Sequence, residues 1–328
     1  VTVFPTHRRM GVMRGMMERH LDAAAEADYP VAALWASETS IYDRFGYGVA
    51  TKGNEVEMRG PTIQFRNSVP SGQVERVTLE KAKDTLPPIF DRFSLTTPGM
   101  FGRNEAWWAN EVLADDEWMK RQRTAIRVVA HRGEEGHDGY AIYRQKSDGT
   151  PDGHANGSID VSEVVAETPD AHASLWSYLT NIDGYPIVKY WAMPVDDPLP
   201  LIVTEPRRVH TTRQWDALWV RILDVEAALS SRSYERDGSL TFSVVDPFRP
   251  STDGVYTLDI VDGIGTCTRS ANDAELDVDI DVLGALFLGG ANAVAYGAAG
   301  RIRGESVAVS ELNAVCRTGK QPWCPEIF

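Results

Sequence analysis

Apolar side chains recur at steps of three and four residues between Gly11 and Ala27, which is the pattern of one buried helix face. The residues in this pattern are Met13, Met16, Met17, Leu21 and Ala24. Residues 1–3 predict a short apolar strand, and residues 31–36 form a continuous apolar run typical of a parallel strand covered on both faces. The pattern therefore predicts strand, helix, strand, with a helix of about four turns.

The loop between the first strand and this helix contains Arg8, Arg9 and Gly11. The N-terminus of a helix offers backbone N–H groups and the positive end of a dipole to an anion. A glycine is needed where the backbone must approach a phosphate closely. The loop therefore predicts a phosphate-binding site.

A second, shorter helix is expected after residues 31–36. Ser37 and Glu38 occupy positions where a helix is capped, and Ile41 and Tyr42 follow within it. The Phe-Gly-Tyr-Gly sequence that comes next turns into another strand.

The segment 52–103 mixes short alternating strands with turns at proline and glycine, including Pro87-Pro88. It is typical of a connecting region that enters a second domain. Two apolar segments, 124–130 and 139–144, flank the charged turn 131–138 and predict a hairpin.

The order strand, helix, strand then recurs. The expected elements are a strand over 158–165, a helix from Thr168 through Leu179 and a strand over 186–193. A basic glycine loop does not precede this helix. The middle of the chain is therefore expected to repeat the first fold without its phosphate site.

The last third of the chain predicts an α+β unit. A polar linker over 196–208 leads to a helix over 215–229, then to alternating strands over 239–245 and 254–260, with apolar helices from Asp281 onward. The run from Val282 to Gly300 is uncharged, but glycines interrupt it. We therefore expect a buried helix followed by a turn rather than a membrane span.

Composition narrows the class of protein. The 328 residues include 33 basic and 47 acidic side chains, and the net charge of −14 opposes non-specific binding to nucleic acid and mildly favours cationic ligands. The three cysteines form no C-x-x-C pair and have no histidine at ligand spacing, so neither a disulfide framework nor a zinc site is indicated and no metal is expected. We expect a cytoplasmic protein without a signal peptide. Hydrolase, zinc-peptidase and triphosphatase motifs are absent from the sequence.

Two motifs resemble those of the GCN5-related N-acetyltransferases (GNAT). Arg8-x-x-Gly11-x-Met13 is similar to the loop whose amides hold the pyrophosphate of acetyl-CoA, and Ile41-Tyr-Asp-Arg-Phe-Gly-Tyr-Gly is similar to a later motif of that family. Further segments resemble the Eis (enhanced intracellular survival) acetyltransferases along essentially the whole chain. They are Pro5-Thr-His-Arg-Arg, Pro30-Val-Ala-Ala-Leu, Ala36-Ser-Glu, Leu218-Trp-Val-Arg-Ile, Leu283 to Gly289 and the terminal Phe328.

The resemblance implies a mixed α/β and α+β protein of three parts. They are the C-terminal half of an acetyl-CoA-binding acetyltransferase domain (residues 1–52), an acetyltransferase-like domain without cofactor (53–210) and a sterol-carrier-like α+β domain (211–328). Such a fold has several strands before the one that carries the loop, so we expect the first domain to be incomplete at its N-terminus in this chain. The resemblance also implies a homohexamer.

The resemblance further implies that acetyl-CoA is the co-substrate and that small cationic amines such as aminoglycosides are the acceptors. Tyr42 would be the general acid that protonates the departing thiolate, and the α-carboxylate of Phe328 the general base that deprotonates the amine. The residues expected to line the pantetheine arm, the pyrophosphate and the thioester are Val1, Thr2, Val3, Arg8, Arg9, Met10, Gly11, Val12, Met13, Arg14, Ser37 and Glu38. Relatives commonly have an acidic residue directly before the terminal Phe, where this chain has Ile327, so cation binding there is expected to differ.

Two other functions remain open. The C-terminal unit with its apolar run could be a lipid- or sterol-binding module. Alternatively, the enzyme could use longer acyl-CoA or acylate protein lysines.

Overall fold

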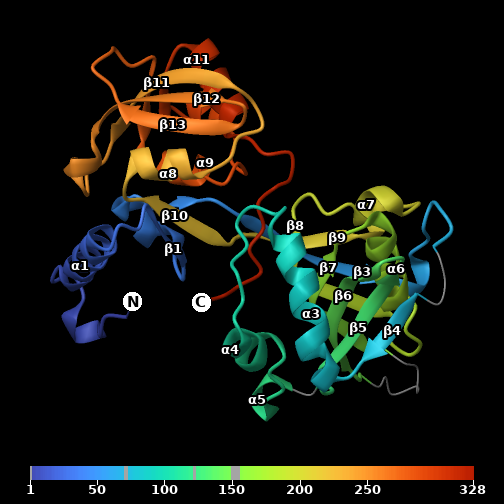
Figure 1. Cartoon of the computed structure of the whole chain (residues 1–328). Helices are drawn as coiled ribbons and strands as arrows, with labels where there is room; N and C mark the ends of the chain where they lie inside the picture. Colours follow the sequence, from blue (N-terminus) through green and yellow to red (C-terminus); the bar gives the residue numbers. More distant parts are fainter. Residues whose placement is uncertain (1, 70–72, 121–122, 149–155) are drawn as a thin grey trace. The chain divides into compact units, whose positions relative to one another are not determined.

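A computed structural model describes residues 2–69, 73–120, 123–148 and 156–328 (Figure 1). The chain folds as two compact units. The first unit comprises Val1–Thr51, Asp216–Pro322 and Ile327–Phe328. The second comprises Lys52–Trp215 and Trp323–Glu326.

The first unit begins with a short 3₁₀ turn, η1 (Pro5–His7), and the helix α1 (Val12–Glu26), followed by α2 (Thr39–Tyr42) and η2 (Asp43–Phe45). Within the described residues, its small sheet has the order β1-β10-β2 and is antiparallel throughout. The three strands are β1 (Val31–Trp35), β10 (Leu218–Ile222) and β2 (Gly48–Val49). Residues far apart in the sequence thus share one sheet.

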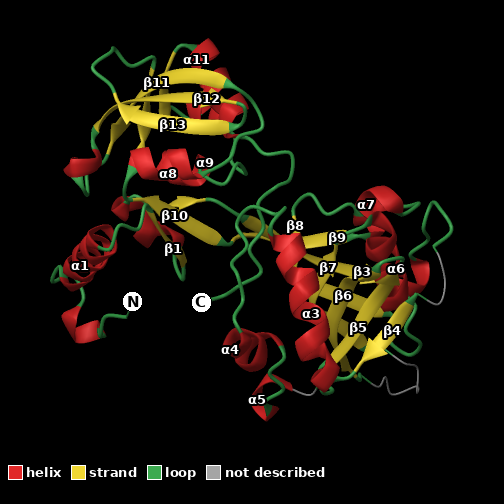
Figure 2. Ribbon diagram, in the orientation of Figure 1, coloured by secondary structure: helices red, strands yellow, loops and turns green. Residues whose placement is uncertain are grey.

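The rest of the first unit is an α+β layer, as the sequence predicted (Figure 2). Its sheet has the order β13-β12-β11-β14-β15 over the part of the chain that the structure describes. The strands are β11 (Gly238–Val245), β12 (Gly254–Val261), β13 (Ile264–Arg269), β14 (Leu276–Asp279) and β15 (Ile302–Gly304). The helical segments are α8 (Val225–Ser231), η6 (Pro250–Thr252), α9 (Ile280–Leu286), α10 (Ala293–Ala298) and α11 (Ser306–Cys316).

The second unit is built on a sheet whose described strands have the order β4-β5-β6-β7-β8-β3-β9. They are β3 (Lys52–Arg59), β4 (Val74–Val77), β5 (Arg127–Gly133), β6 (Gly136–Lys146), β7 (Ser158–Ala166), β8 (Ile187–Pro194) and β9 (His210–Asp216). The helical segments are η3 (Gly60–Thr62), α3 (Leu79–Ser94), α4 (Glu105–Trp107), η4 (Trp108–Val112), α5 (Glu117–Lys120), α6 (Pro169–Thr180), α7 (Leu199–Ile202) and η5 (Pro206–Arg208).

Helices α3 and α6 cover opposite faces of this sheet (Figure 2). Val128 and Tyr140 belong to the core cluster of α3, whereas their neighbours Val129 and Ala141 belong to the cluster of α6. Successive side chains of a strand point to opposite faces, so two separate cores lie on the two sides of one sheet.

The predicted strand-helix-strand repeat and hairpin are confirmed. Strands β5 and β6 form an antiparallel hairpin, and its turn is shorter than expected because Arg132 pairs with His137 and Gly133 with Gly136. Strand β7 leads through α6 to β8, and β7 pairs with β8 in parallel. Thr168 caps α6 by accepting a hydrogen bond from the amide of Ala171.

Helix α3 was missed by the sequence analysis, which placed turns at Pro87-Pro88. Both prolines lie inside α3. Each removes a backbone donor, yet the helix buries Ala82, Leu86 and Phe90 against the sheet. Tertiary burial therefore outweighs the local cost of the prolines.

Two strand predictions were wrong. Residues 2–4 form no strand in the described structure. Strand β1 pairs antiparallel with residues 218–222 of β10 rather than with a parallel neighbour, and it is only half-buried along its length. The predicted helix over 215–229 was therefore wrong in its first half, since residues 218–222 form strand β10 and helix α8 begins only at Val225.

The apolar run from Val282 to Gly300 forms α9 and α10, with a turn between them, as predicted. The residues 282–286 of α9 are buried. None of the helices in the described ranges is long and apolar enough to cross a membrane.

Candidate active site

A cavity of about 730 Å³ lies in the first unit around the start of α1. Its lining comes from the segment before α1, the first turn of α1, the region of α2 and the loop after β11. The lining residues are Thr2, Val3, His7, Arg8, Arg9, Gly11, Val12, Met13, Arg14, Ser37, Glu38, Ile41, Tyr42, Arg44, Phe45 and Phe248.

Gly11 shapes the helix end of this cavity. It is the N-cap residue of α1, with φ at 79° in the left-handed region, and no side chain caps the helix there. A Cβ atom on Gly11 would meet nothing within 4 Å. A helix N-terminus without a side-chain cap and with open space beside its N-cap residue is suited to bind an anion.

Positive charge collects at the same end of the cavity. Arg8, Arg9 and Arg14 line it, although the whole chain carries a net charge of −14. The guanidinium of Arg14 lies 5.2 Å from the ring centre of Phe248 and bonds Glu18 at 2.9 Å. Arginine side chains and helix amides together suit a phosphate-bearing ligand.

Tyr42 lies in the same cavity, at the end of α2. Tyr42 is 5 % exposed, and its ring contacts that of Tyr47 edge-on, with 6.2 Å between the ring centres. Burial raises the pKa of Tyr47 to about 12 against the opposing effect of Arg221, so Tyr47 stays protonated at neutral pH. Of the two tyrosines, Tyr42 is the one that lines the cavity.

The Phe-Gly-Tyr-Gly turn has its glycines for two different reasons. Gly46 has φ at 83°, and a Cβ there would lie 2.8 Å from the guanidinium carbon of Arg221. Gly48 has no such dihedral, but a Cβ on it would lie 1.8 Å from the backbone oxygen of Asp281 in α9. Close packing against β10 and α9 thus fixes the turn that follows Tyr42.

The structure brings together most of the residues that the sequence singled out. Met10 is exposed and is not among the described lining residues, and Val1 lies outside the described residues. Phe328 is also not among those lining residues. The roles assigned to all of these residues stay predictions.

Other lining residues were missed as site residues. Ile41, Arg44 and Phe45 lie within the motif around Tyr42, and His7 belongs to the segment Pro5-Thr-His-Arg-Arg. Phe248 follows β11, and its ring centre lies 4.9 Å from that of Phe45. Only the fold brings Phe248 to the cavity, because no local sequence pattern links it to Phe45, about 200 residues earlier in the chain.

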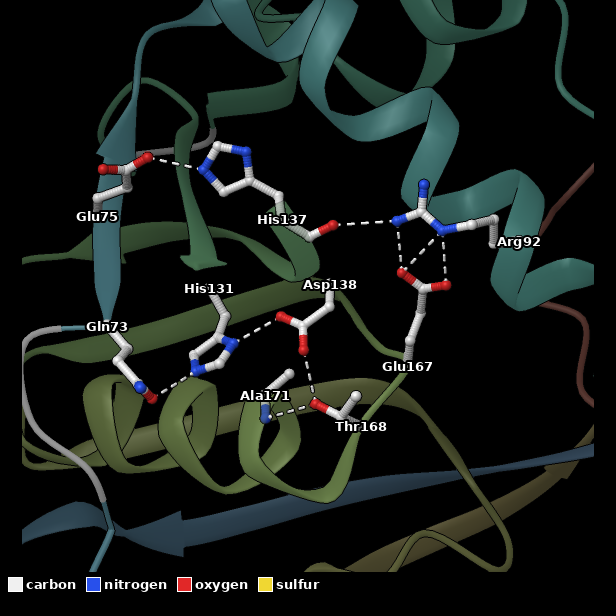
Figure 3. A network of polar contacts seen from close by, with 9 residues as sticks. All are labelled: Gln73, Glu75, Arg92, His131, His137, Asp138, Glu167, Thr168 and Ala171. Atoms are coloured by element: carbon white, nitrogen blue, oxygen red, sulfur yellow. Dashed lines mark hydrogen bonds and ion pairs between the residues drawn. The ribbon is translucent and has the colours of Figure 1, made fainter. Parts of the chain in front are cut away.

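The second unit has a different helix start. Figure 3 shows Thr168 between Asp138 and the amide of Ala171, with hydrogen bonds of 2.7 and 3.2 Å. The imidazole of His131 lies 2.6 Å from Asp138, and Arg92 pairs with Glu167 at 2.6 Å. Side chains of the unit itself therefore cap α6.

The cavity beside this helix start measures about 1040 Å³ and is rich in carboxylates. Its acidic lining residues are Asp84, Glu134, Glu135, Asp138, Glu167 and Asp170. These carboxylates would repel a pyrophosphate, in contrast to the arginines at α1.

Comparison with known proteins agrees with this geometry. Acetyltransferase (GNAT) domain families match residues 1–50 and 99–222, and a sterol carrier protein domain family matches residues 225–325. An uncharacterized N-acetyltransferase of Streptomyces avermitilis is 35 % identical over 348 residues, covering 100 % of this chain and 79 % of the relative. N-acetyltransferase Eis of Mycobacterium tuberculosis is 36 % identical over 308 residues, covering 92 % of this chain and 73 % of Eis.

The chain belongs to the Eis family of GNAT acetyltransferases. The crystal structure of Eis1 from Mycobacterium abscessus has a TM-score of 0.87 at 28 % identity and covers 100 % of this chain and 81 % of Eis1. The predicted fold class, two acetyltransferase folds and a sterol-carrier-like domain, is confirmed. As a GNAT acetyltransferase, the protein uses acetyl-CoA as its co-substrate.

Proposed function

We propose that this Eis-family acetyltransferase transfers the acetyl group of acetyl-CoA directly to amines of aminoglycosides or related polycationic amines. The observation that carries the proposal is the single cavity that joins the α1 helix start to Tyr42. It offers an anion-binding end that suits the pyrophosphate of CoA and a phenol that suits the role of general acid.

The anion-binding end would hold the pyrophosphate. Amides of the first turn of α1 would donate to its oxygens, while Arg8, Arg9 and Arg14 balance its charge. Thr2 and Val3 would line the pantetheine arm, and Ser37 and Glu38 would lie beside the thioester. Glu38 adds a carboxylate at the end where a cationic acceptor is expected.

The proposed chemistry balances without a covalent enzyme intermediate. The amine nitrogen attacks the thioester carbonyl carbon, the new C–N bond forms and the C–S bond breaks. The α-carboxylate of Phe328 accepts the first proton, which the ammonium group loses before the attack, and later releases it to solvent. The hydroxyl of Tyr42 donates a proton to the departing sulfur, and the second nitrogen proton, lost as the amide forms, restores the Tyr42 hydroxyl. An ammonium ion has no lone pair for this attack, so a nearby base is needed.

The acceptor preference follows from charge. The chain is strongly acidic overall, which attracts polycations over long range. The relatives named Eis support an N-acetyltransferase that acts on amines. The first part of the apolar run that suggested a lipid carrier is taken up by packing, since residues 282–286 of α9 are buried within their own unit.

Two further expectations remain proposals. We propose that the domain boundaries lie at residues 52 and 210. We also propose that the second acetyltransferase-like domain binds no cofactor, which the carboxylates beside the start of α6 support. We also propose a homohexamer, which sedimentation of the purified protein would test.

The decisive test measures CoA release with acetyl-CoA and kanamycin-class amines, followed by mass spectrometry of the product. We expect a mass increase of one or more acetyl groups. Removal of Phe328 should abolish most turnover, and unchanged turnover would reject the terminal base. Longer acyl-CoA and lysine peptides, offered in competition, distinguish the other acyltransferase functions.

A further inference from the structure

Strands β7 and β8 of the second unit pair only over their first halves. The parallel register runs from Ser158 with Ile187 to Val161 with Tyr190, although β7 continues to residue 166 and β8 to residue 194. Backbone groups beyond the last pair need other partners.

Two tryptophans supply such partners. The indole N–H of Trp191 donates to the carbonyl of Ser162 at 3.2 Å, and that of Trp323 donates to the carbonyl of Ala192 at 2.8 Å. Trp191 belongs to β8 itself. Trp323, by contrast, comes from the C-terminal segment, residues 323–328, after the chain has passed through the whole first unit.

Trp323 is an integral core residue of the second unit. It is 2 % exposed, its amide donates to the carbonyl of Pro98 at 2.9 Å, and its ring lies edge-on to Phe93 of α3 at 6.2 Å. Residues 323–326 accordingly belong to the second unit, whereas residues 316–322 belong to the first.

Arg103 contacts the same C-terminal segment at Glu326, three residues after Trp323. Its guanidinium forms two hydrogen bonds to Glu163 of β7, at 2.9 and 2.5 Å, and its Nε donates to Glu326 at 2.6 Å. The Arg103 side chain is 3 % exposed and lies 3.8 Å from the ring centre of Phe90. This one cation therefore joins a strand carboxylate to a carboxylate of the C-terminal segment.

Two uncharged donors complete the contact. The indole N–H of Trp107 donates to the other oxygen of Glu326 at 2.8 Å, and the Tyr140 hydroxyl donates to Glu163 at 2.6 Å. Without Arg103, two buried carboxylates would face each other with only neutral donors between them, which disfavours the docked segment.

We propose that the second unit anchors the C-terminal segment and that Arg103 is the positioning residue for the terminal carboxylate. This inference rests on the proposed role of Phe328 as general base. Phe328 follows Glu326 by two residues, and a fully extended chain covers about 3.5 Å per residue. Fixing Glu326 therefore keeps the terminal carboxylate within about 7 Å of the anchored residue, which limits the positions that the proposed base can sample.

The test compares two anchoring variants with two matched controls in the whole protein. Arg103→Met and Trp323→Phe each remove one anchor. Trp191→Phe removes the corresponding indole bond that does not involve the segment, and Arg92→Met removes an exposed ion pair on α3. Arg103→Lys restores the charge.

The first measurement is the rate at which a carboxypeptidase trims the C-terminus, followed by intact mass. We expect trimming to accelerate about tenfold in both anchoring variants, because each loses a buried hydrogen bond that holds the segment in place. The controls should match the native rate, and Arg103→Lys should lie between. Native-like trimming in both anchoring variants would overturn the anchor, whether or not the protein acetylates amines.

The second measurement is the steady-state kinetics. We expect kcat to fall about tenfold with the KM for acetyl-CoA within about twofold, because the base is misplaced while the cofactor cavity is intact. The deficit in kcat should narrow as pH rises, because an acceptor amine that is already deprotonated needs no base. Faster trimming with unchanged kcat would overturn the positioning role. Absence of acetyltransferase activity in the protein without substitutions would instead reject the proposed function.

Discussion

Arg221 of β10 donates to Asp246 at 2.5 Å, and both side chains are fully buried. Asp246 also accepts hydrogen bonds from the amides of Phe248 and Arg249, at 3.2 and 3.0 Å. The strand that pairs with β1 is thereby tied to the loop that brings Phe248 to the cavity. Asp246 compensates the desolvation of Arg221, whose pKa is lowered by burial.

Replacing Asp246 with Asn should destabilise the first unit strongly. The change leaves the Arg221 guanidinium buried without a counterion, and removing one partner of a buried pair costs about 3–5 kcal/mol. Urea unfolding followed by tryptophan fluorescence measures the loss. The exposed pair Arg236–Glu311 provides the control, since Arg236→Met should change stability by less than about 1 kcal/mol. Equal effects of the two substitutions would contradict this account.

Gly11→Ala should weaken acetyl-CoA binding. A side chain at φ 79° costs about 1–2 kcal/mol, and its Cβ would point into the open space where a phosphate is expected. We expect the KM for acetyl-CoA to rise about tenfold with little change in kcat, because uniform binding is lost.

Gly15 provides the matched control for this substitution. It lies inside α1, has nothing within 4 Å of a built Cβ and has no positive φ. Gly15→Ala should stabilise the helix by about 0.5–1 kcal/mol and leave the KM unchanged. A similar KM increase in both variants would show that helix α1 as a whole, rather than its N-cap, determines binding.

Local patterns predicted the elements of this fold well where one face is buried. The steps of three and four residues gave α1, and Thr168 marked the start of α6, because helix periodicity and caps are local properties. The pairing of β1 with β10 could not be predicted, since strand partners 190 residues apart leave no local signal. Helix α3 could not be predicted for a similar reason, because its prolines are tolerated only through tertiary burial.

The candidate site divides in the same way. Arg8, Gly11 and Tyr42 could be chosen from short motifs, and the structure gathers them in one cavity. Phe248 and Arg103 lie far from those motifs in the sequence, and only the fold shows what they contact. Residues that act through the fold therefore have to be found in the structure.

The stability of the protein should depend on pH through Glu326. Burial raises the pKa of this carboxyl, against the opposing effect of Arg103 and with Glu163 adding to the rise. A group with a raised pKa contributes stability that is complete below its unfolded pKa and is lost as pH rises through the folded pKa. The window therefore begins near the ordinary value of 4.5 and extends upward.

The Glu326→Gln variant isolates this effect because it cannot ionise. We expect the free energy of unfolding of the native protein, minus that of Glu326→Gln, to fall as pH rises from about 4.5 to neutrality. Urea unfolding at a series of pH values gives this difference. A difference that grows with pH would mean that Arg103 favours the ionised carboxylate more than burial opposes it.

Tyr42 and Tyr47 form a natural pair for testing the general acid, because they belong to one motif and their rings touch, yet only Tyr42 lines the cavity. Tyr42→Phe keeps the ring and removes the proton donor, so the departing thiolate would have to leave unprotonated. We expect kcat to fall about 10²-fold or more with the KM for acetyl-CoA nearly unchanged. Tyr47→Phe should retain most of kcat, since Tyr47 is buried and is not among the described residues that line the cavity. Steady-state CoA release by both variants decides the assignment, and an equal loss in the two would assign the effect to packing of the motif instead of proton donation.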